Sequence, residues 1–106
     1  MSRIAYVNGQ YRDMRDASVN IEDRGYQFSD GVYEVCEIRG GKVVDMPRHL
    51  TRLQRSLREL RIDMPMPLTS LEIVIHETVR RMINTLVVDL LDRVQEMADN
   101  PNDITG

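Results

Sequence analysis

The sequence predicts an α+β fold in which a small antiparallel β-hairpin sheet is followed by two helices, the second of them long. The first half of the chain carries short runs of β-forming residues separated by glycine turns. The second half carries apolar residues at three- and four-residue steps. Strands that precede helices are typical of an α+β domain, and 106 residues with 42% apolar content suit one modest domain.

The strands are expected in the first half of the chain. Ile4–Val7 and residues 10–12 flank Asn8-Gly9, a pair that suits the two positive φ angles of a tight hairpin turn. Residues 19–21 are a plausible third short strand. Residues 32–39 are rich in Val, Tyr and Ile, and Gly40-Gly41 then turns the chain into residues 42–45. The sequence therefore predicts two hairpins with a short strand between them.

The first helix is predicted over residues 47–60. Asp45 is a candidate cap, and Pro47 suits the first helical turn. Leucines recur at helical spacing, so one face of this helix is expected to point inward; they are Leu50, Leu53, Leu57 and Leu60.

The second helix is expected to begin at a capping box formed by Thr69 and Glu72. Its apolar stripe continues to residue 98, which would make the helix about 45 Å long at a rise of about 1.5 Å per residue. A domain of this size cannot cover such a length, so part of the stripe is expected to need another partner. Asn100-Pro101 should end the helix, and the remaining residues are expected to be frayed.

Charge and cysteine content narrow the class of protein. A net charge of −3 argues against a general electrostatic hold on nucleic acid or on an anionic membrane. The single cysteine, Cys36, has no disulfide partner, and no Cys/His spacing suggests a metal site. The chain shows neither a signal-like segment nor an apolar run of membrane-spanning length. These features predict a cytoplasmic protein.

Candidate functional residues lie on the first helix. A step of about 100° per residue places Arg48, Arg52 and Arg55 together opposite the leucines, and His49 at the border of the apolar face. Such an arginine row is either a solvated basic face or a phosphate clamp, for which the planar guanidinium fork is well suited. His49 is either a half-buried packing residue or a catalyst.

Three further side chains carry chemistry in principle. Tyr33 follows the Asp30-Gly31 turn, where it is either a surface aromatic or a phenol presented to a cleft. Cys36 is expected to be a small buried apolar residue rather than a nucleophile. His76 projects away from the apolar stripe and is expected to be solvated.

Several separate motifs occur in an order that resembles one family. They are AYVNGQY, EDRGYQFSDGVYEV, a Gly-Gly-Lys hairpin, RHLTRLQRSLREL and RIDMPMP. Together they resemble the N-terminal portion of the class IV (fold type IV) pyridoxal-phosphate aminotransferases, and within that family most closely the D-amino-acid transaminases. The resemblance covers residues 3–82 and predicts the fold of the small N-terminal domain of those enzymes.

The resemblance implies specific roles. Arg52 matches the arginine that holds the phosphate of pyridoxal phosphate, and Tyr33 matches the tyrosine whose hydroxyl helps to bind the substrate carboxylate. Glu34, Val35 and His49 match supporting positions around the pocket. The family reaction moves an amino group from a D-amino acid to a 2-oxo acid by way of the cofactor.

The resemblance does not extend beyond residue 82. Residues 83–106 do not match the strand and the arginine-x-histidine element that follow in the family, and the Schiff-base lysine and the glutamate that pairs with the pyridine nitrogen are also missing. The only lysine is Lys42, in an exposed hairpin, where a largely protonated amine is a poor nucleophile. We therefore expect a domain at 1–82, a divergent helical tail at 83–106 and no catalytic residue in this chain. Whether the chain alone binds pyridoxal phosphate stays open.

Three interpretations remain. The first is a truncated D-amino-acid transaminase-like protein without turnover of its own. The second is a non-catalytic α+β module or remnant that self-associates, as a homodimer, through its C-terminal helix. The third is a relative within the same fold, such as a branched-chain aminotransferase or an aminodeoxychorismate lyase.

Overall fold

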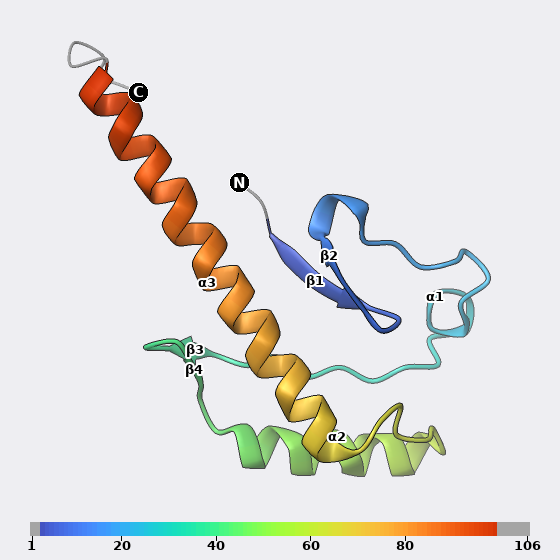
Figure 1. The fold of residues 1–106 in the computed structure, drawn as a ribbon. Helices are drawn as coiled ribbons and strands as arrows, with labels where there is room; N and C mark the ends of the chain where they lie inside the picture. The colour runs from blue at the N-terminus through green and yellow to red at the C-terminus, as the bar shows by residue number, and fades with distance from the viewer. Residues whose placement is uncertain (1–2, 100–106) are drawn as a thin grey trace.

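The computed structural model describes residues 3–99 and confirms the α+β class (Figure 1). The elements are, in order, β1 (Ile4–Val7), β2 (Gln10–Asp13), a 3₁₀ turn (Met14–Asp16), α1 (Arg24–Phe28), β3 (Ile38–Arg39), β4 (Lys42–Val43), α2 (Met46–Leu60) and α3 (Leu68–Asp99). The strands form two separate two-stranded sheets, β1-β2 and β3-β4. The expected tail beyond the long helix lies outside the described residues.

The first hairpin agrees with the prediction. β1 and β2 are antiparallel, with Tyr6 opposite Tyr11 and Val7 opposite Gln10. Asn8 and Gly9 both have positive φ angles, 50° and 85°, which is the backbone that a two-residue mirror-image turn requires. The rings of Tyr6 and Tyr11 meet edge to face, with their centroids 5.0 Å apart. This contact supports the register of the hairpin.

The expected third strand at residues 19–21 is wrong. The chain there is irregular and turns at Ile21, because nearby side-chain oxygens accept hydrogen bonds from the backbone amides. Asn20 Oδ1 accepts a hydrogen bond from the Glu22 amide at 2.8 Å. Asp23 Oδ1 accepts one from the Gly25 amide at 2.8 Å and so caps α1. The segment therefore makes a turn and a short helix in place of a strand.

The second hairpin is shorter than predicted. Its turn is confirmed, since Gly40 and Gly41 have φ angles of 59° and 77°. The strands themselves, however, are limited to β3 and β4, and residues 32–37 do not form a strand. The reason is that Asp45 takes a left-handed backbone and α2 starts at Met46. The returning strand therefore ends before it can pair with residues 32–36, and its last backbone hydrogen bond runs from the Val44 amide to the Glu37 carbonyl at 2.9 Å.

Both predicted helices are present, but their expected caps are wrong. Asp45 makes no side-chain capping bond, because its left-handed backbone (φ 57°) differs from the extended geometry of a capping residue. α3 begins at Leu68, and the Pro67 carbonyl accepts the Leu71 amide at 3.0 Å, so Thr69 lies inside the first turn. α3 is assigned as one helix through residues 84 and 85 and also runs unbroken across the predicted domain boundary at residue 82. That boundary stays a prediction.

The described core is small and includes Leu50 and Leu57 of α2 and Val79 of α3. Leu60 was expected to point inward but is half-exposed, because the last turn of α2 is not covered. α3 packs against β1 and β4. On the β1-β2 side, the Arg81 guanidinium lies 4.0 Å from the centre of the Tyr11 ring and is held by Glu77 through a 2.9 Å hydrogen bond. This cation–π contact joins α3 to the first hairpin.

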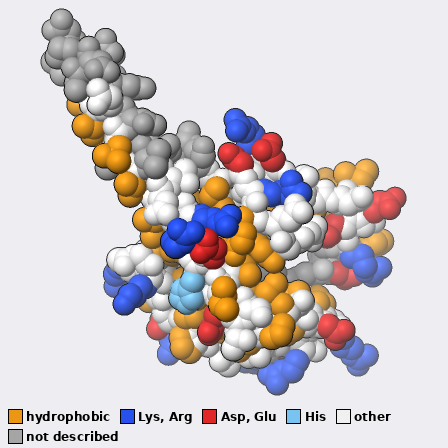
Figure 2. All heavy atoms as spheres, in the orientation of Figure 1, with side chains coloured by type: hydrophobic (Ala, Val, Ile, Leu, Met, Phe, Trp, Pro, Cys, Tyr) orange, Lys and Arg blue, Asp and Glu red, His pale blue; other side chains and the backbone are white. Residues whose placement is uncertain are grey.

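The rest of α3 projects beyond the body of the protein (Figures 1 and 2). The radius of gyration is 18.1 Å, whereas a compact chain of this length would have a value of about 13 Å. Hydrophobic side chains follow the projecting part and are exposed to solvent; they are Leu86, Val87, Leu91, Val94 and Met97. In residues 3–99, no helix combines the length and apolar character that a membrane span requires.

Candidate functional site

The candidate site is a cluster of Glu34, His49 and Arg52. Glu34 comes from segment 31–37, which precedes β3, and the other two residues come from the first turns of α2. Arg52 Nη2 donates to Glu34 Oε1 at 2.8 Å, and Arg52 Nε donates to Oε2 at 3.0 Å and to Oε1 at 3.2 Å. His49 Nδ1 lies 2.7 Å from Glu34 Oε1. His49 and Arg52, which follow Glu34 by 15 and 18 positions in the sequence, thus both bind its carboxylate.

The alternating exposure of the side chains in segment 31–37 shows which way Glu34 faces. Along segment 31–37, residues 32, 34 and 36 are partly buried, and residues 33, 35 and 37 are exposed. Neighbouring side chains of an extended segment point to opposite sides, so Glu34 faces α2 while Tyr33 and Val35 face away. The spacing of His49 and Arg52 places both on one side of α2. The cluster is therefore a contact between an extended segment and a helix.

The hydrogen bonds and the opposite charges of Glu34 and Arg52 shift the pKa of each residue so that both stay ionised. Hydrogen bonds from Arg52 and then from His49 lower the pKa of Glu34 from its ordinary value of 4.5 to about 2. The bond to Glu34 raises the pKa of Arg52 above its ordinary value. Burial, and then the nearby Glu34 charge, raises the pKa of Cys36. At neutral pH Glu34 is therefore a carboxylate and Arg52 a guanidinium, and the nearby Cys36 is a neutral thiol.

The ionisation of Glu34 also determines which ring nitrogen of His49 carries a hydrogen. An ionised carboxylate can only accept hydrogen bonds, so the 2.7 Å contact requires a hydrogen on His49 Nδ1. The 3.4 Å separation between Arg52 Nη2 and His49 Nδ1 then joins two donors and is not a hydrogen bond. His49 is half-buried and hydrogen-bonded, which agrees with the packing interpretation of this residue.

The other arginines of the row do not join the cluster. Arg48 is exposed, and Arg55 Nε donates to Glu59 one turn further along α2 at 3.3 Å. The solvated-face interpretation therefore holds for these two residues, and Arg52 alone is drawn into the cluster. Lys42 is exposed in β4, as expected from its place in the hairpin.

Tyr33 is not brought to Arg52. Its side chain is 85% exposed and lies on the opposite side of segment 31–37 from Glu34. Val35 is exposed on the same side as Tyr33, and Cys36 is partly buried on the side of Glu34. His76 is exposed, as predicted. Segment 31–37 therefore separates an exposed aromatic and apolar face from the face that carries the charged cluster.

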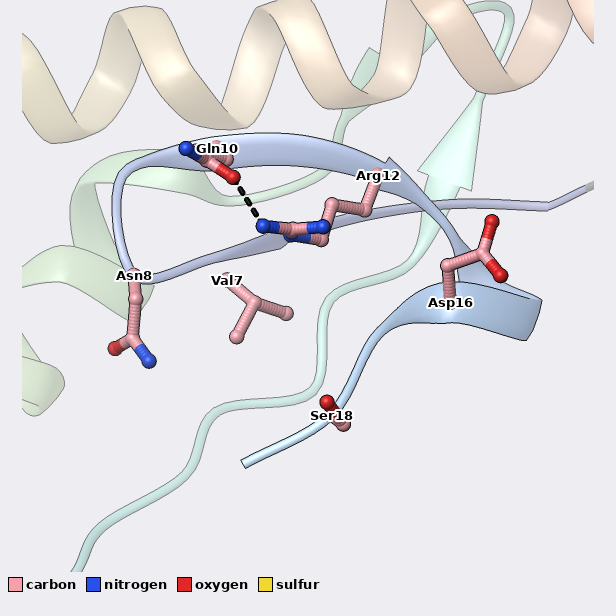
Figure 3. A pocket seen from close by; sticks show the side chains of 6 residues that line it. All are labelled: Val7, Asn8, Gln10, Arg12, Asp16 and Ser18. Atoms are coloured by element: carbon pink, nitrogen blue, oxygen red, sulfur yellow. Dashed lines mark hydrogen bonds between the residues drawn. The ribbon is translucent and has the colours of Figure 1, made fainter. Parts of the chain in front are cut away.

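The described pockets lie elsewhere. One of about 280 Å³ is bounded by the first hairpin and the residues after it: Val7, Asn8, Gln10, Arg12, Asp16 and Ser18 (Figure 3). In it, the Arg12 guanidinium is turned to the Gln10 side-chain carbonyl, which accepts its hydrogen bond. Two more pockets lie beside the second half of α2. Among residues 3–99, no three His, Cys, Asp or Glu side chains are grouped closely enough to hold a metal ion.

Comparison with known proteins identifies the family. A family model described as amino-transferase class IV matches residues 31–91, which is more than half of the chain. The chain therefore belongs to the class IV aminotransferases, and the matched range contains the Glu34, His49 and Arg52 cluster. The resemblance of the sequence motifs to this family is confirmed.

Within this family, the chain is similar to D-alanine aminotransferases. It is 46% identical to that of Bacillus licheniformis over 54% of this chain and 20% of the relative. It is 39% identical to that of Listeria innocua over 78% of this chain and 26% of the relative, and 35% identical to that of Staphylococcus haemolyticus over 71% and 27%. The chain spans about a quarter of the length of these relatives. The comparison with solved structures gave no match.

The cluster should make the protein sensitive to acid. Because the pKa of Glu34 is about 2 in the folded state and 4.5 ordinarily, the unfolded chain binds more protons at low pH. The stabilisation is complete above about pH 5 and is lost as the pH falls toward 2. Urea unfolding midpoints measured over this range should fall less steeply for Glu34→Gln than for the unmodified chain. Equal slopes would contradict this prediction.

Proposed function

We propose that this chain supplies the N-terminal part of a pyridoxal-phosphate site of the D-amino-acid transaminase type, in which Arg52 binds the cofactor phosphate. In the complete enzyme, an amino group would pass from a D-amino acid to a 2-oxo acid. The similarity to D-alanine aminotransferases supports this reaction and these substrates. The observation that carries the proposal is the planar guanidinium of Arg52, held on one side by Glu34 and otherwise open to solvent.

The residues present can supply some of the hydrogen-bond donors that a phosphate group needs. A guanidinium has five N–H donors, and Glu34 uses those of Nε and one of Nη2. The Arg52 side chain is 58% exposed, so its remaining donors are accessible to an anion. Because Glu34 balances the charge of Arg52, a phosphate would need further donors from outside this cluster for firm binding.

The exposed face of segment 31–37 has a proposed role as well. Tyr33 would donate its phenolic hydrogen to the substrate carboxylate, and Val35 beside it would form part of the apolar wall that excludes water. His49 would support the pocket through Glu34. Pyridoxal phosphate, when bound, supplies an aldehyde that reacts with amino groups and a ring that withdraws electrons.

Catalysis requires groups that this chain does not place at the cluster. Lys42 is exposed in β4, and the hydrogen bonds described for Glu34, His49 and Arg52 do not include it. We propose that the lysine that anchors the cofactor and the glutamate that pairs with its ring nitrogen come from the larger remainder that the relatives possess. Under this proposal the chain alone has no transaminase turnover. The domain division at 82/83 and a cytoplasmic location belong to the same proposal.

A second proposed property is self-association through α3. Five apolar side chains of its projecting part are exposed, and neighbouring exposed apolar side chains mark a surface suited to bind a partner. They recur at three- and four-residue steps, so they share one side of the helix. A second copy of the same helix would cover this surface.

The phosphate proposal can be tested with ligands that lack the reactive aldehyde. Equilibrium dialysis of the chain against pyridoxine phosphate and against pyridoxine compares two ligands that differ only in the phosphate. We expect the phosphate ligand to bind about tenfold more tightly, since charge-assisted hydrogen bonds contribute about 1.5–3 kcal/mol. Arg52→Lys keeps the charge but loses the planar fork, and it should remove most of this preference.

Arg55→Lys is the matched control for this experiment. Arg55 lies on the same helix, is exposed and is paired only with Glu59 in the described contacts. The preference for the phosphate ligand should therefore survive in this variant. If the unmodified chain binds both ligands equally, or if both variants behave alike, Arg52 is not the phosphate-binding residue.

A further inference from the structure

We infer that Glu34 is a positioning residue that selects which edge of the Arg52 guanidinium is presented to the cofactor phosphate. The inference rests on the proposed function, because it takes Arg52 as the phosphate ligand. It goes beyond that function in assigning to Glu34 an action on Arg52 and not on the cofactor or the substrate.

The pattern of hydrogen bonds defines the presented edge. Nε–H and one Nη2–H run parallel along one side of the planar guanidinium, and both go to the Glu34 carboxylate, at 3.0 and 2.8 Å. The other two-donor edge is formed by Nη1 and the second hydrogen of Nη2. Within residues 3–99 no hydrogen bond donated by Nη1 is described. That edge is suited to donate two parallel bonds to phosphate oxygens.

The difference in burial shows which partner holds the other. The Glu34 side chain is 15% exposed, whereas that of Arg52 is 58% exposed. A long arginine side chain on a helix surface has many rotamers, and an anion that binds it must restrict them. The partly buried carboxylate restricts them before any anion arrives. Glu34 therefore preorganises Arg52 and lowers the entropic cost of binding.

His49 holds the carboxylate itself. Its Nδ1–H donates to Oε1, the same oxygen that accepts from Arg52 Nη2, while Oε2 accepts from Arg52 Nε. Both carboxylate oxygens are thus engaged by residues one turn apart on α2. Rotation of the carboxylate would break at least one of these bonds. His49 consequently acts through Glu34 and leaves the outer edge of Arg52 free.

The inference is tested by the side-chain N–H of Arg52 in ¹⁵N NMR spectra of the full chain, assigned with Arg52→Lys. In the unmodified chain, this Nε–H should exchange slowly with water because it is bound to Glu34. In Glu34→Gln, the exchange should become at least about tenfold faster, since the amide offers one acceptor oxygen in place of two. Circular dichroism establishes that the variant is folded.

Glu37→Gln is the matched control. It removes the same charge from the same segment, but Glu37 is exposed and its described side-chain partner is Arg39, at 2.7 Å. The Arg52 Nε–H should exchange in this variant as in the unmodified chain. Equal exchange rates in all three proteins would overturn the role of Glu34.

The phosphate preference separates positioning from simple charge balance. Removing a negative charge beside Arg52 would strengthen phosphate binding if Glu34 only balanced charge. Positioning predicts the opposite, a preference for pyridoxine phosphate over pyridoxine that is several-fold lower in Glu34→Gln. An unchanged or increased preference overturns the inference. If the unmodified chain shows no preference, the proposed function fails, while the NMR exchange rates still decide whether Glu34 positions Arg52.

Discussion

Leu50→Ala should lower the free energy of unfolding by about 2–5 kcal/mol, the range for truncating a buried leucine. The Leu50 side chain is 4% exposed, and it is one of the few apolar side chains that the described part of the chain removes from water. The substitution removes apolar contact and leaves a cavity in a core too small to close over it. Natural domains are stable by only about 5–15 kcal/mol, so the variant should be partly unfolded at 37 °C.

Leu60→Ala provides the comparison, because it is the same substitution on the same helix at a side chain that is 51% exposed. It should cost less than about 1 kcal/mol, since exposed positions lose little apolar burial. Urea unfolding followed by circular dichroism gives both values. Similar midpoints for the two variants would show that the face of α2 carrying Leu50 is not the core.

The second large effect is expected on self-association. The unmodified chain should sediment as a concentration-dependent mixture of monomer and dimer. Leu91→Lys should shift this equilibrium toward monomer by at least about tenfold, because a buried leucine contributes about 1.5–3 kcal/mol and every 1.4 kcal/mol is tenfold in affinity. Leu91 is 61% exposed in the projecting part of α3, where a second copy would cover it.

Ile73→Lys is the control for this experiment. Ile73 is 67% exposed and lies in the part of the same helix that is closer to the body of the protein. Its replacement adds the same charge but should leave the association unchanged. Sedimentation of the unmodified chain as a single monomer at all concentrations would exclude the proposed interface.

Local sequence signals predicted the local structure well. Asn8-Gly9 and Gly40-Gly41 made their turns because these residues adopt positive φ with little strain. The helical period of the leucines predicted α2, and the apolar stripe predicted α3 with its uncovered end. Some failures were local, at residues 19–21 and at the two helix caps, and the largest one arose where a distant partner was needed. Residues 32–37 have strong β propensity, but a strand requires a neighbour to pair with, and the described chain offers only two residues in β4.

The candidate site was predicted only in part. The resemblance to the family singled out Arg52, Tyr33, Glu34 and His49, but it assigned Glu34 no more than a supporting position. The signals were present, since Glu34 alternates with the exposed Tyr33 and Val35, and His49 and Arg52 are three residues apart on a helix. No pattern within the sequence, however, states that segment 31–37 lies against α2.

The sequence by itself therefore determined the two glycine turns, the helices α2 and α3, the family and the identity of the phosphate-binding candidate. These properties follow from local backbone preferences and from short motifs that neighbouring residues carry. The tertiary structure alone decided that Glu34 meets Arg52 and His49 across 15 to 18 residues, and that Tyr33 points away from them. The physical reason is that contacts between distant segments depend on how whole elements pack, and the same local sequence is compatible with more than one packing.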